Sequence, residues 1–237
     1  MLLSTRNLSR SFGGLRAVDG VDFDLPAGEI RAIIGPNGAG KTTFVSLVCG
    51  RLTSDFGEIV FEGRNVATLP AFRRVQLGIA YTFQITSVFK NLTAFENVAL
   101  AAQDNSASAA SGGSIDERTA GALHRVGLSA RSAAKAGELP YGYQRLLEVA
   151  MALALSPKLL ILDEPTQGLS DSEIVDFSNL IRAISAEATV LLIEHNMTVV
   201  MDLAQRITVM NQGRILAEGT PTEIRASVAV QQAYLGA

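Results

Sequence analysis

The sequence predicts an α/β fold, in which buried strands alternate with helices along the chain. Three short, largely apolar runs carry this prediction, because such segments of strand length are typical of strands covered on both faces of a sheet. The runs occupy residues 29–34, 158–162 and 189–193. A helical pattern follows each of the first two runs, as expected for an open α/β sheet with its ligand edge at the carboxyl ends of the strands.

A glycine-rich segment between the first buried strand and the next helix fits the phosphate-binding pattern G-x-x-x-x-G-K-[ST]. Small residues let backbone N–H groups curl around a polyphosphate, and the helix predicted over residues 42–49 directs its positive dipole end at the same anion. Lys41 would reach the β- and γ-phosphates, and the Thr42 hydroxyl would ligate Mg²⁺. The strand before and the helix after favour a nucleotide site over a glycine turn with a chance lysine. The segment comprises Gly35, Pro36, Asn37, Gly38, Ala39, Gly40, Lys41, Thr42 and Thr43.

Composition limits the class of protein. At 237 residues and 48% hydrophobic content, the chain has enough apolar material for one compact unit. No apolar run approaches the roughly 20 residues that span a bilayer, and the first residues lack a signal-peptide layout. A net charge of −3 without a basic stripe argues against a nucleic-acid partner. The single cysteine, Cys49, excludes an internal disulfide and is expected to be buried. Together these features indicate a soluble cytoplasmic protein.

The first part of the chain is expected to form strands over residues 2–12 and 21–25, the second with the alternation of a half-buried strand. Phe12 precedes a Gly-Gly turn upstream of the phosphate loop. An aromatic ring there stacks on an adenine or packs in the core, and the residues alone leave both readings open.

The middle of the chain carries two further strands, over residues 57–63 and 78–84. The second ends on Gln84, and an amide at a strand's carboxyl end is well placed for a ligand. A capping-box pattern at residues 93–96 opens a helix through residue 100, and another helix runs from residue 115 to the glycine at 127. A glycine-centred motif, Leu-Pro-Tyr-Gly-Tyr-Gln at residues 139–144, precedes a helix predicted over residues 145–155.

Two adjacent acids, Asp163 and Glu164, follow the second buried strand. Ionised acids there need a partner, and Mg²⁺ with a nucleotide satisfies them. Asp163 is expected to hold the metal through water, while Glu164, facing the other way by strand alternation, accepts a proton from water. The alternative is a strand that merely ends in solvated acids. His195 follows the third buried strand and is therefore expected at the ligand edge.

The last part of the chain shows three local signals. Residues 170–173 cap a helix that runs to about residue 186, residues 206–210 and 214–216 form a hairpin around a glycine, and residues 220–223 cap the last helices.

The chain resembles the ATP-binding subunits of ABC transporters over essentially its whole length. The resemblance rests on five motifs in order: the phosphate loop, Gln84, the motif at 139–144, Asp163 with Glu164, and His195. It implies one ATPase domain with a P-loop NTPase (RecA-like) core over residues 1–85 and 158–237. That core carries an antiparallel β subdomain, and residues 86–157 form an inserted α-helical signature subdomain.

Within that superfamily the chain is most similar to the branched-chain amino acid importer ATPases. Urea and short-chain amide importers share these features, and residues 168–173 are slightly more similar to those importers. The subgroup likeness is carried by Tyr141-Gly142, Gln144-Arg145, Leu147-Glu148, and by residues 193–197, 217–221 and 234–236.

The resemblance implies cofactors, roles and partners. ATP and Mg²⁺ are the cofactors, with Thr42, Gln84 and Asp163 around the metal. Phe12 would stack on adenine, and Gln84 would sense the γ-phosphate and face the permease. The other implied roles fall on Glu164 as general base, on His195 as a γ-phosphate contact, and on Tyr141 and Gly142 as part of a signature motif over a second subunit's ATP.

The implied complex contains transmembrane permease subunits and a second ATPase, identical or paralogous. It also contains a periplasmic or extracellular solute-binding protein, and the ATPase lies peripherally on the cytoplasmic face of the inner membrane. The sequence does not identify the transported solute, because the ATPase does not contact it. The choice of import over export rests on analogy with the family.

Four departures from the family pattern weaken the half-site offered to the second subunit. In the signature motif Leu-Ser-Gly-Gly-Gln, Pro140 replaces the serine and also lacks an N–H, and Tyr143 replaces the glutamine. Met151 occupies a position where the family commonly has an arginine, and Ser170 occupies one where it often has an aspartate. Slower hydrolysis or an unequal heterodimer is expected. The rival interpretations are a regulatory nucleotide-binding module with negligible turnover, a nucleic-acid-linked ABC protein, and a P-loop kinase, which would not need Gln144 or His195.

Overall fold

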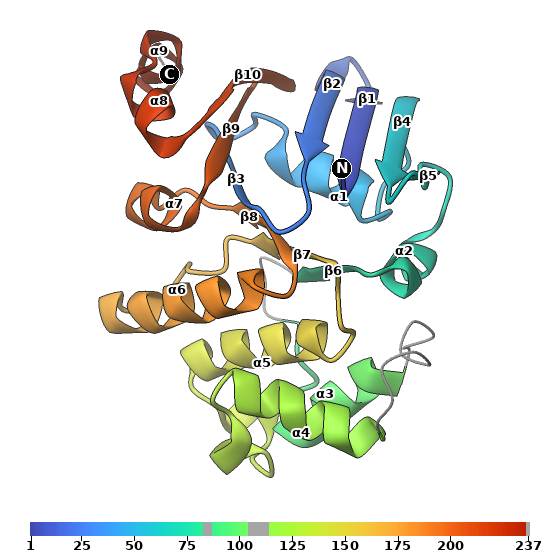
Figure 1. Ribbon diagram of the computed structural model, residues 1–237, viewed down its shortest axis with the longest axis vertical. Coiled ribbons are helices and arrows are strands. Elements are labelled where there is room, and N and C mark those ends of the chain that lie inside the picture. Colours follow the sequence, from blue (N-terminus) through green and yellow to red (C-terminus); the bar gives the residue numbers. More distant parts are fainter. Residues whose placement is uncertain (83–86, 104–113, 236–237) are drawn as a thin grey trace.

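The computed structural model describes residues 1–82, 87–103 and 114–235. Gln84 and the terminal glycine of the subgroup pattern lie outside these residues, so the predictions made for them stay predictions. The described chain forms two sheets, with helices on both sides of the larger one (Figure 1).

The smaller sheet is antiparallel and contains the N-terminal strands, in the order β2-β1-β4-β5 across the described residues. Leu3 pairs with Leu25 on one side and with Phe61 on the other, which places β1 in the middle. The predicted strands near the N-terminus and at residues 57–63 are therefore confirmed. The bounds are β1 Leu3–Phe12, β2 Leu15–Leu25, β4 Phe56–Phe61 and β5 Arg64–Asn65.

The larger sheet has the order β10-β9-β3-β8-β7-β6 among the described residues. Strands β9, β3, β8, β7 and β6 are parallel, and β10 returns antiparallel to β9 as the predicted hairpin. Every residue of β3, β7 and β8 is buried, which confirms the interpretation of the three apolar runs. The bounds are β3 Ile30–Ile34, β6 Ile79–Thr82, β7 Leu159–Asp163, β8 Thr189–Ile193, β9 Arg206–Asn211 and β10 Arg214–Gly219.

The helices largely begin where the capping patterns predict. Side-chain and backbone hydrogen bonds of a capping box form at Thr93, Ser170 and Thr220. The helix predicted from residue 145 starts earlier, at Tyr141, because the weak helix formers Tyr and Gly in its first turn conceal the helical periodicity. The bounds are α1 Lys41–Val48, α2 Ala71–Leu77, α3 Ala94–Gln103, α4 Ile115–Arg125, α5 Tyr141–Leu153, α6 Asp171–Ser185, α7 Met197–Leu203, α8 Pro221–Ala226 and α9 Val228–Leu235.

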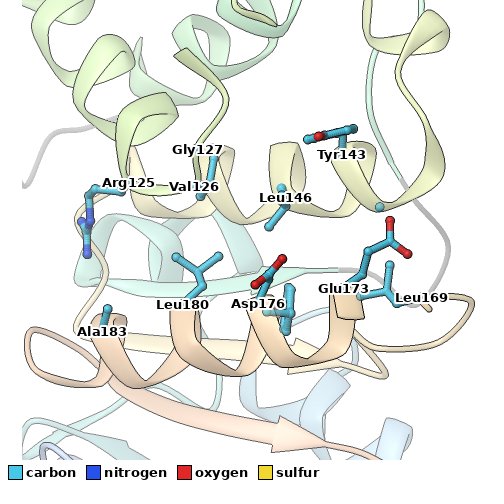
Figure 2. A pocket seen from close by; sticks show the side chains of 12 residues that line it. Arg125, Val126, Gly127, Tyr143, Leu146, Leu169, Glu173, Asp176, Leu180 and Ala183 are labelled. Carbon is cyan, nitrogen blue, oxygen red and sulfur yellow. The ribbon is translucent and has the colours of Figure 1, made fainter. Parts of the chain in front are cut away.

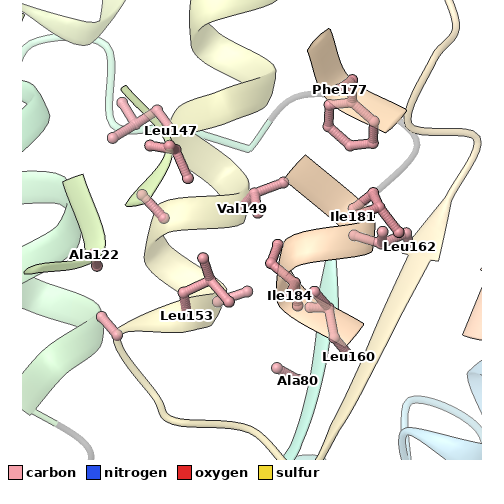
Figure 3. Close-up of a cluster of buried hydrophobic side chains, with 14 of the residues drawn as sticks. Ala80, Ala122, Leu147, Val149, Leu153, Leu160, Leu162, Phe177, Ile181 and Ile184 are labelled. Carbon is pink, nitrogen blue, oxygen red and sulfur yellow. The ribbon is translucent and has the colours of Figure 1, made fainter. Parts of the chain in front are cut away.

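The two faces of the larger sheet pack against different helices. Leu159 and Ile161 of β7 belong to the hydrophobic cluster that includes the buried residues of α1. Leu160 and Leu162, which alternate with them, pack with residues of α5 and α6 on the opposite face (Figure 3). The helix after the phosphate loop and the helix after the signature motif therefore lie on opposite sides of the sheet.

Arg74 of α2 is a buried arginine that closes the end of α1. Its guanidinium donates to the carbonyl oxygens of Leu47 and Val48 at 2.6 and 2.8 Å, and to those of Ala67 and Leu69 at 2.9 Å each. Carbonyl groups in the last turn of a helix lack partners within the helix, and Arg74 supplies them. The helix that follows the phosphate loop is thus fixed at its far end by a side chain distant in sequence.

We expect Arg74→Ala to lower the free energy of unfolding by about 3 kcal/mol, because buried carbonyl groups lose a charged donor. Urea unfolding of the purified protein measures this change. The matched control is Arg73→Ala, since the exposed side chain of Arg73 donates to the Gln76 side chain and not to a carbonyl group of α1. A loss below about 0.5 kcal/mol is expected for Arg73→Ala. Equal losses in the two variants would contradict the role of Arg74.

Candidate nucleotide-binding and catalytic site

The phosphate loop packs closely against two neighbouring backbones, and this explains the glycines at Gly35 and Gly40. A Cβ atom at Gly35 would lie 2.1 Å from the Met210 carbonyl oxygen, and one at Gly40 would lie 2.2 Å from the Ala17 carbonyl oxygen. Gly40 is also left-handed, with φ 99°, and it is the N-cap of α1 without a side-chain hydrogen bond to the first turn. The first N–H groups of α1 are therefore available to an anion.

Lys41 stands at the start of α1 with its ammonium folded over the loop. Its Nζ donates to the carbonyl oxygens of Gly35 at 2.7 Å and Pro36 at 3.1 Å. Burial lowers the pKa of Lys41, and the nearby carboxylates of Glu164 and Asp163 oppose that shift. The lysine and both acids are therefore close enough for their charges to interact, and their predicted roles at one ligand stay predictions.

Asp163 is the last residue of β7 and is buried. Its Oδ2 accepts a 2.7 Å hydrogen bond from the Tyr81 hydroxyl, while its Oδ1 has no hydrogen-bond partner among the described residues. Burial raises the pKa of the Asp163 carboxyl, and the hydrogen bond from Tyr81 opposes the shift. Burial and the same hydrogen bond raise the pKa of the Tyr81 hydroxyl, so it remains a donor.

Glu164 lies in the turn that follows β7. The expectation that strand alternation directs its side chain away from that of Asp163 is therefore corrected. β7 ends at Asp163, and Glu164 has a left-handed backbone, with φ 48°. Its N–H donates to the Ile193 carbonyl oxygen at 2.8 Å. Its Oε2 lies 3.8 Å from Nδ1 of His195, so the loops after β7 and β8 bring these two side chains together.

Glu194 is a residue for which the sequence analysis predicted no role. It is buried, and its Oε1 accepts from the N–H of Thr166 at 3.0 Å and from the Thr166 hydroxyl. Its Oε2 accepts from the N–H groups of His195 at 3.0 Å and Asn196 at 3.1 Å. One carboxylate thus joins the loop that carries Glu164 to the loop that carries His195. The signal available in the sequence was an acid directly after a buried strand.

Phe12 lies at the tip of the β1–β2 hairpin, and the residue is 44% exposed. The exposure excludes the alternative of a core phenylalanine. The Arg10 guanidinium lies 5.0 Å from the ring centroid, and β2 of the same hairpin borders the phosphate loop through Ala17.

Tyr141 and Gly142 are not near the phosphate loop in this chain, because α5 covers the opposite face of the sheet from α1. They contact the segment after β7 instead. A Cβ at Gly142 would lie 2.2 Å from Glu173 Oε1, and one at Gly168 would lie 3.0 Å from the Tyr141 ring. Beside them, a cleft of about 420 Å³ runs between α5 and α6 (Figure 2). The cleft shows that the packing between these helices is incomplete.

The residues present fit a Mg²⁺–nucleotide. The closely packed glycine loop at the start of α1 suits a polyphosphate, and Asp163 Oδ1, which has no hydrogen-bond partner among the described residues, is a hard oxygen of the kind that Mg²⁺ prefers. Thr42 lies exposed in the first turn of α1, where its hydroxyl is accessible. The fold and this constellation define a P-loop nucleotide-binding protein.

Comparison with known proteins identifies the family. The family model described as ABC transporter matches residues 18–167, and the one described as branched-chain amino acid ATP-binding cassette transporter matches residues 214–237. The high-affinity branched-chain amino acid transport ATP-binding protein LivG of Escherichia coli (strain K12) is 37% identical over 249 residues, covering 99% of this chain and 98% of the relative. BraF of Pseudomonas aeruginosa, with the same description, is 38% identical with the same coverage.

Among solved structures, the ADP conformation of an ATP-binding cassette of an ABC transporter superposes with a TM-score of 0.88 at 30% identity. It covers 100% of this chain and 99% of that chain. The chain therefore belongs to the ABC transporter family, as an ATP-binding subunit whose reaction is ATP hydrolysis coupled to transport. The predicted fold class is confirmed. No helix in the described part of the chain is long and apolar enough to cross a membrane.

We expect Glu194→Gln to lower kcat for ATP hydrolysis about tenfold or more, because an amide cannot accept every hydrogen bond that the carboxylate accepts. The ATP dissociation constant should change less than about threefold, since the donors to Glu194 lie outside the phosphate loop. Steady-state kinetics and equilibrium ATP binding measure both quantities. Glu187→Gln, at an exposed position, is the control. An unchanged kcat in Glu194→Gln would refute the role.

Proposed function

We propose that this chain is the ATP-hydrolysing motor subunit of an importer for branched-chain amino acids. The observation that carries the proposal is the convergence of Lys41, Asp163, Glu164 and His195 at the carboxyl edge of one sheet beside a glycine-lined loop. The solute class is supported by the names of LivG and BraF and by the family model over residues 214–237. Urea and short-chain amides, suggested by residues 168–173, are the alternative solutes.

Hydrolysis in this proposal is in-line attack of water on the γ-phosphorus of ATP. Glu164 accepts a proton from the water as the new P–O bond forms and the bond to the bridging oxygen breaks. Lys41 and the N–H groups of α1 hold the phosphates, and His195 contacts the γ-phosphate. Thr42 and Asp163 would hold Mg²⁺, which would neutralise part of the charge of the phosphates. The protein's contribution is mainly positional and electrostatic.

Two cassettes are required, because Tyr141 and Gly142 lie across the sheet from the phosphate loop of their own chain. These residues close over the ATP of a second subunit, which is identical or paralogous. The cleft between α5 and α6 supports movement of the helices of residues 86–157 relative to the core over residues 1–85 and 158–237. Closure on ATP and reopening after hydrolysis drive the transport cycle.

The proposed partners are membrane permease subunits that dock beside Gln84, and a periplasmic or extracellular solute-binding protein in the wider complex. The proposed location is therefore peripheral, on the cytoplasmic face of the membrane. Genes for permeases and a solute-binding protein beside the gene for this chain would support import. The rival, a regulatory module with negligible turnover, rests on Pro140 and Tyr143 and is separated from the motor by measured turnover.

We expect Glu164→Gln to reduce ATP turnover at least about a hundredfold, because the proton acceptor is lost. ATP binding should persist, since the phosphate loop is unchanged. Steady-state ATPase assays and equilibrium binding with labelled ATP measure the two effects. Glu62→Gln, at an exposed position on the surface, is the control and should behave as the unmodified protein.

Turnover per chain should rise with protein concentration in the unmodified protein, because each site needs residues of a second subunit. Unchanged turnover in Glu164→Gln would refute the general base. A turnover per chain that is independent of concentration would argue against a composite site in a dimer of this chain and point to a paralogous partner.

We expect Pro140→Ser to raise both stability and turnover. Pro140 is the exposed N-cap of α5 and makes no side-chain hydrogen bond to the helix, so a serine cap should add about 0.5–1 kcal/mol to the free energy of unfolding. The serine hydroxyl also becomes available to the second subunit's ATP, and kcat should rise at least about threefold. Pro140→Ala lacks the hydroxyl and is the control. Equal kcat in Pro140→Ser and Pro140→Ala would contradict the prediction.

A further inference from the structure

Tyr81 contacts the carboxylate at the end of the neighbouring strand. Tyr81 on β6 pairs in parallel register with Ile161 on β7, and both side chains pack on the α1 side of the sheet. The Tyr81 hydroxyl reaches past Ile161 and donates to Asp163 Oδ2 at 2.7 Å. Because two strands of one sheet set the positions of both residues, the contact is a rigid feature of the core.

The Tyr81 ring makes a second contact, with an arginine. The guanidinium of Arg51 lies 5.2 Å from the ring centroid, in the geometry of a cation–π contact. Arg51 follows the C-terminal end of α1, the helix that starts in the phosphate loop. Tyr81 therefore lies between the strand that carries Asp163 and the chain that leaves α1, and its hydroxyl has little freedom to move away.

The chemistry of the contact suits a site for a cation. Asp163 is only 1% exposed, so its two oxygens depend on partners inside the protein. Tyr81 satisfies Oδ2, and Oδ1 has no hydrogen-bond partner in the described chain. A phenol is a neutral donor, so it fixes the orientation of the carboxylate without cancelling its negative charge, whereas an arginine or lysine there would compete with the metal.

We propose that Tyr81 is a positioning residue of the Mg²⁺–nucleotide site, which holds Asp163 so that Oδ1 is presented to the metal or to its bound water. Tyr81 acts through Asp163 and does not touch the nucleotide. Outer partners of metal-binding carboxylates fix their orientation in many proteins, and their loss weakens metal binding about 10- to 100-fold. The inference rests on the proposed role of Asp163 in Mg²⁺ binding.

The test compares nucleotide affinity with and without the metal. Tyr81→Phe removes only the hydroxyl and leaves the ring, and titration calorimetry with ADP avoids turnover. In excess Mg²⁺ the ADP dissociation constant of Tyr81→Phe should rise about tenfold. In EDTA it should match the unmodified protein within about twofold, because the phosphate loop is intact. An equal loss in both conditions, or no loss in Mg²⁺, overturns the proposal.

Thr208→Val is the matched control. Thr208 is buried on β9 of the same sheet, and its hydroxyl also donates to a carboxylate oxygen, Glu218 Oε1, at 2.6 Å. Loss of this hydroxyl should leave ADP affinity unchanged in Mg²⁺ and in EDTA. A metal-specific loss in Thr208→Val as large as that in Tyr81→Phe would show that any buried hydroxyl in the sheet has this effect, and would overturn the proposal.

Asp163→Ala distinguishes the proposed metal role of Asp163 from the positioning role of Tyr81. If Asp163→Ala does not weaken ADP binding in Mg²⁺, the proposed metal role of Asp163 fails, and with it the role of Tyr81. If Asp163→Ala weakens binding and Tyr81→Phe does not, only the inference on Tyr81 fails. In the double variant, Tyr81→Phe should add less than about twofold to the effect of Asp163→Ala. Additive effects would mean that Tyr81 acts elsewhere, and would overturn the proposal.

Discussion

The site depends on three buried parallel strands that end at one edge of the larger sheet. β3 leads into the phosphate loop, β7 ends on Asp163, and β8 is followed by Glu194. Polar and charged groups can occupy the ends of such strands only where partners meet them, since the strands are covered on both faces. Glu194 connects two of these strand ends, because its carboxylate accepts hydrogen bonds from the loop after β7 and from its own loop after β8. The loops after β7 and β8 are therefore held together by one carboxylate in addition to the hydrogen bonds between the strands.

Alternation along β7 divides the molecule into two functional sides. Its odd-numbered apolar residues face α1 and the phosphate loop, while its even-numbered ones face α5 and α6. A strand cannot present the same residue to both sides, so the signature residues and the phosphate loop are separated by the thickness of the sheet. The separation of Tyr141 and Gly142 from the phosphate loop thus follows from the alternation of side chains along a single strand.

Much of this organisation could be predicted from local patterns. The three apolar runs, the capping boxes and the hairpin all lie within a few residues of sequence, and each formed as expected. The phosphate loop could also be predicted, because its motif is a local sequence pattern. In the structure, Gly35 and Gly40 are required by close contacts with the backbones of Met210 and Ala17. The start of α5 was misplaced, since tyrosine and glycine in a first turn carry little helical signal. The sequence analysis predicted no role for Arg74, Tyr81 and Glu194, because their side chains contact residues that are distant in the sequence.

The contacts that could not be predicted from the sequence are those that orient the carboxylates of Asp163 and Glu194. Tyr81 and Asp163 are 82 residues apart, and Thr166 and Glu194 are 28 apart, so only the sheet register brings each pair together. Glu164 shows the same dependence in its backbone. A left-handed glutamate costs about 1 kcal/mol relative to glycine, yet glycine would remove the carboxylate that lies 3.8 Å from His195. The hydrogen bond from the Glu164 N–H to Ile193 helps to hold this conformation. Local strain is thus retained where the position of a carboxylate matters more than the stability of the turn.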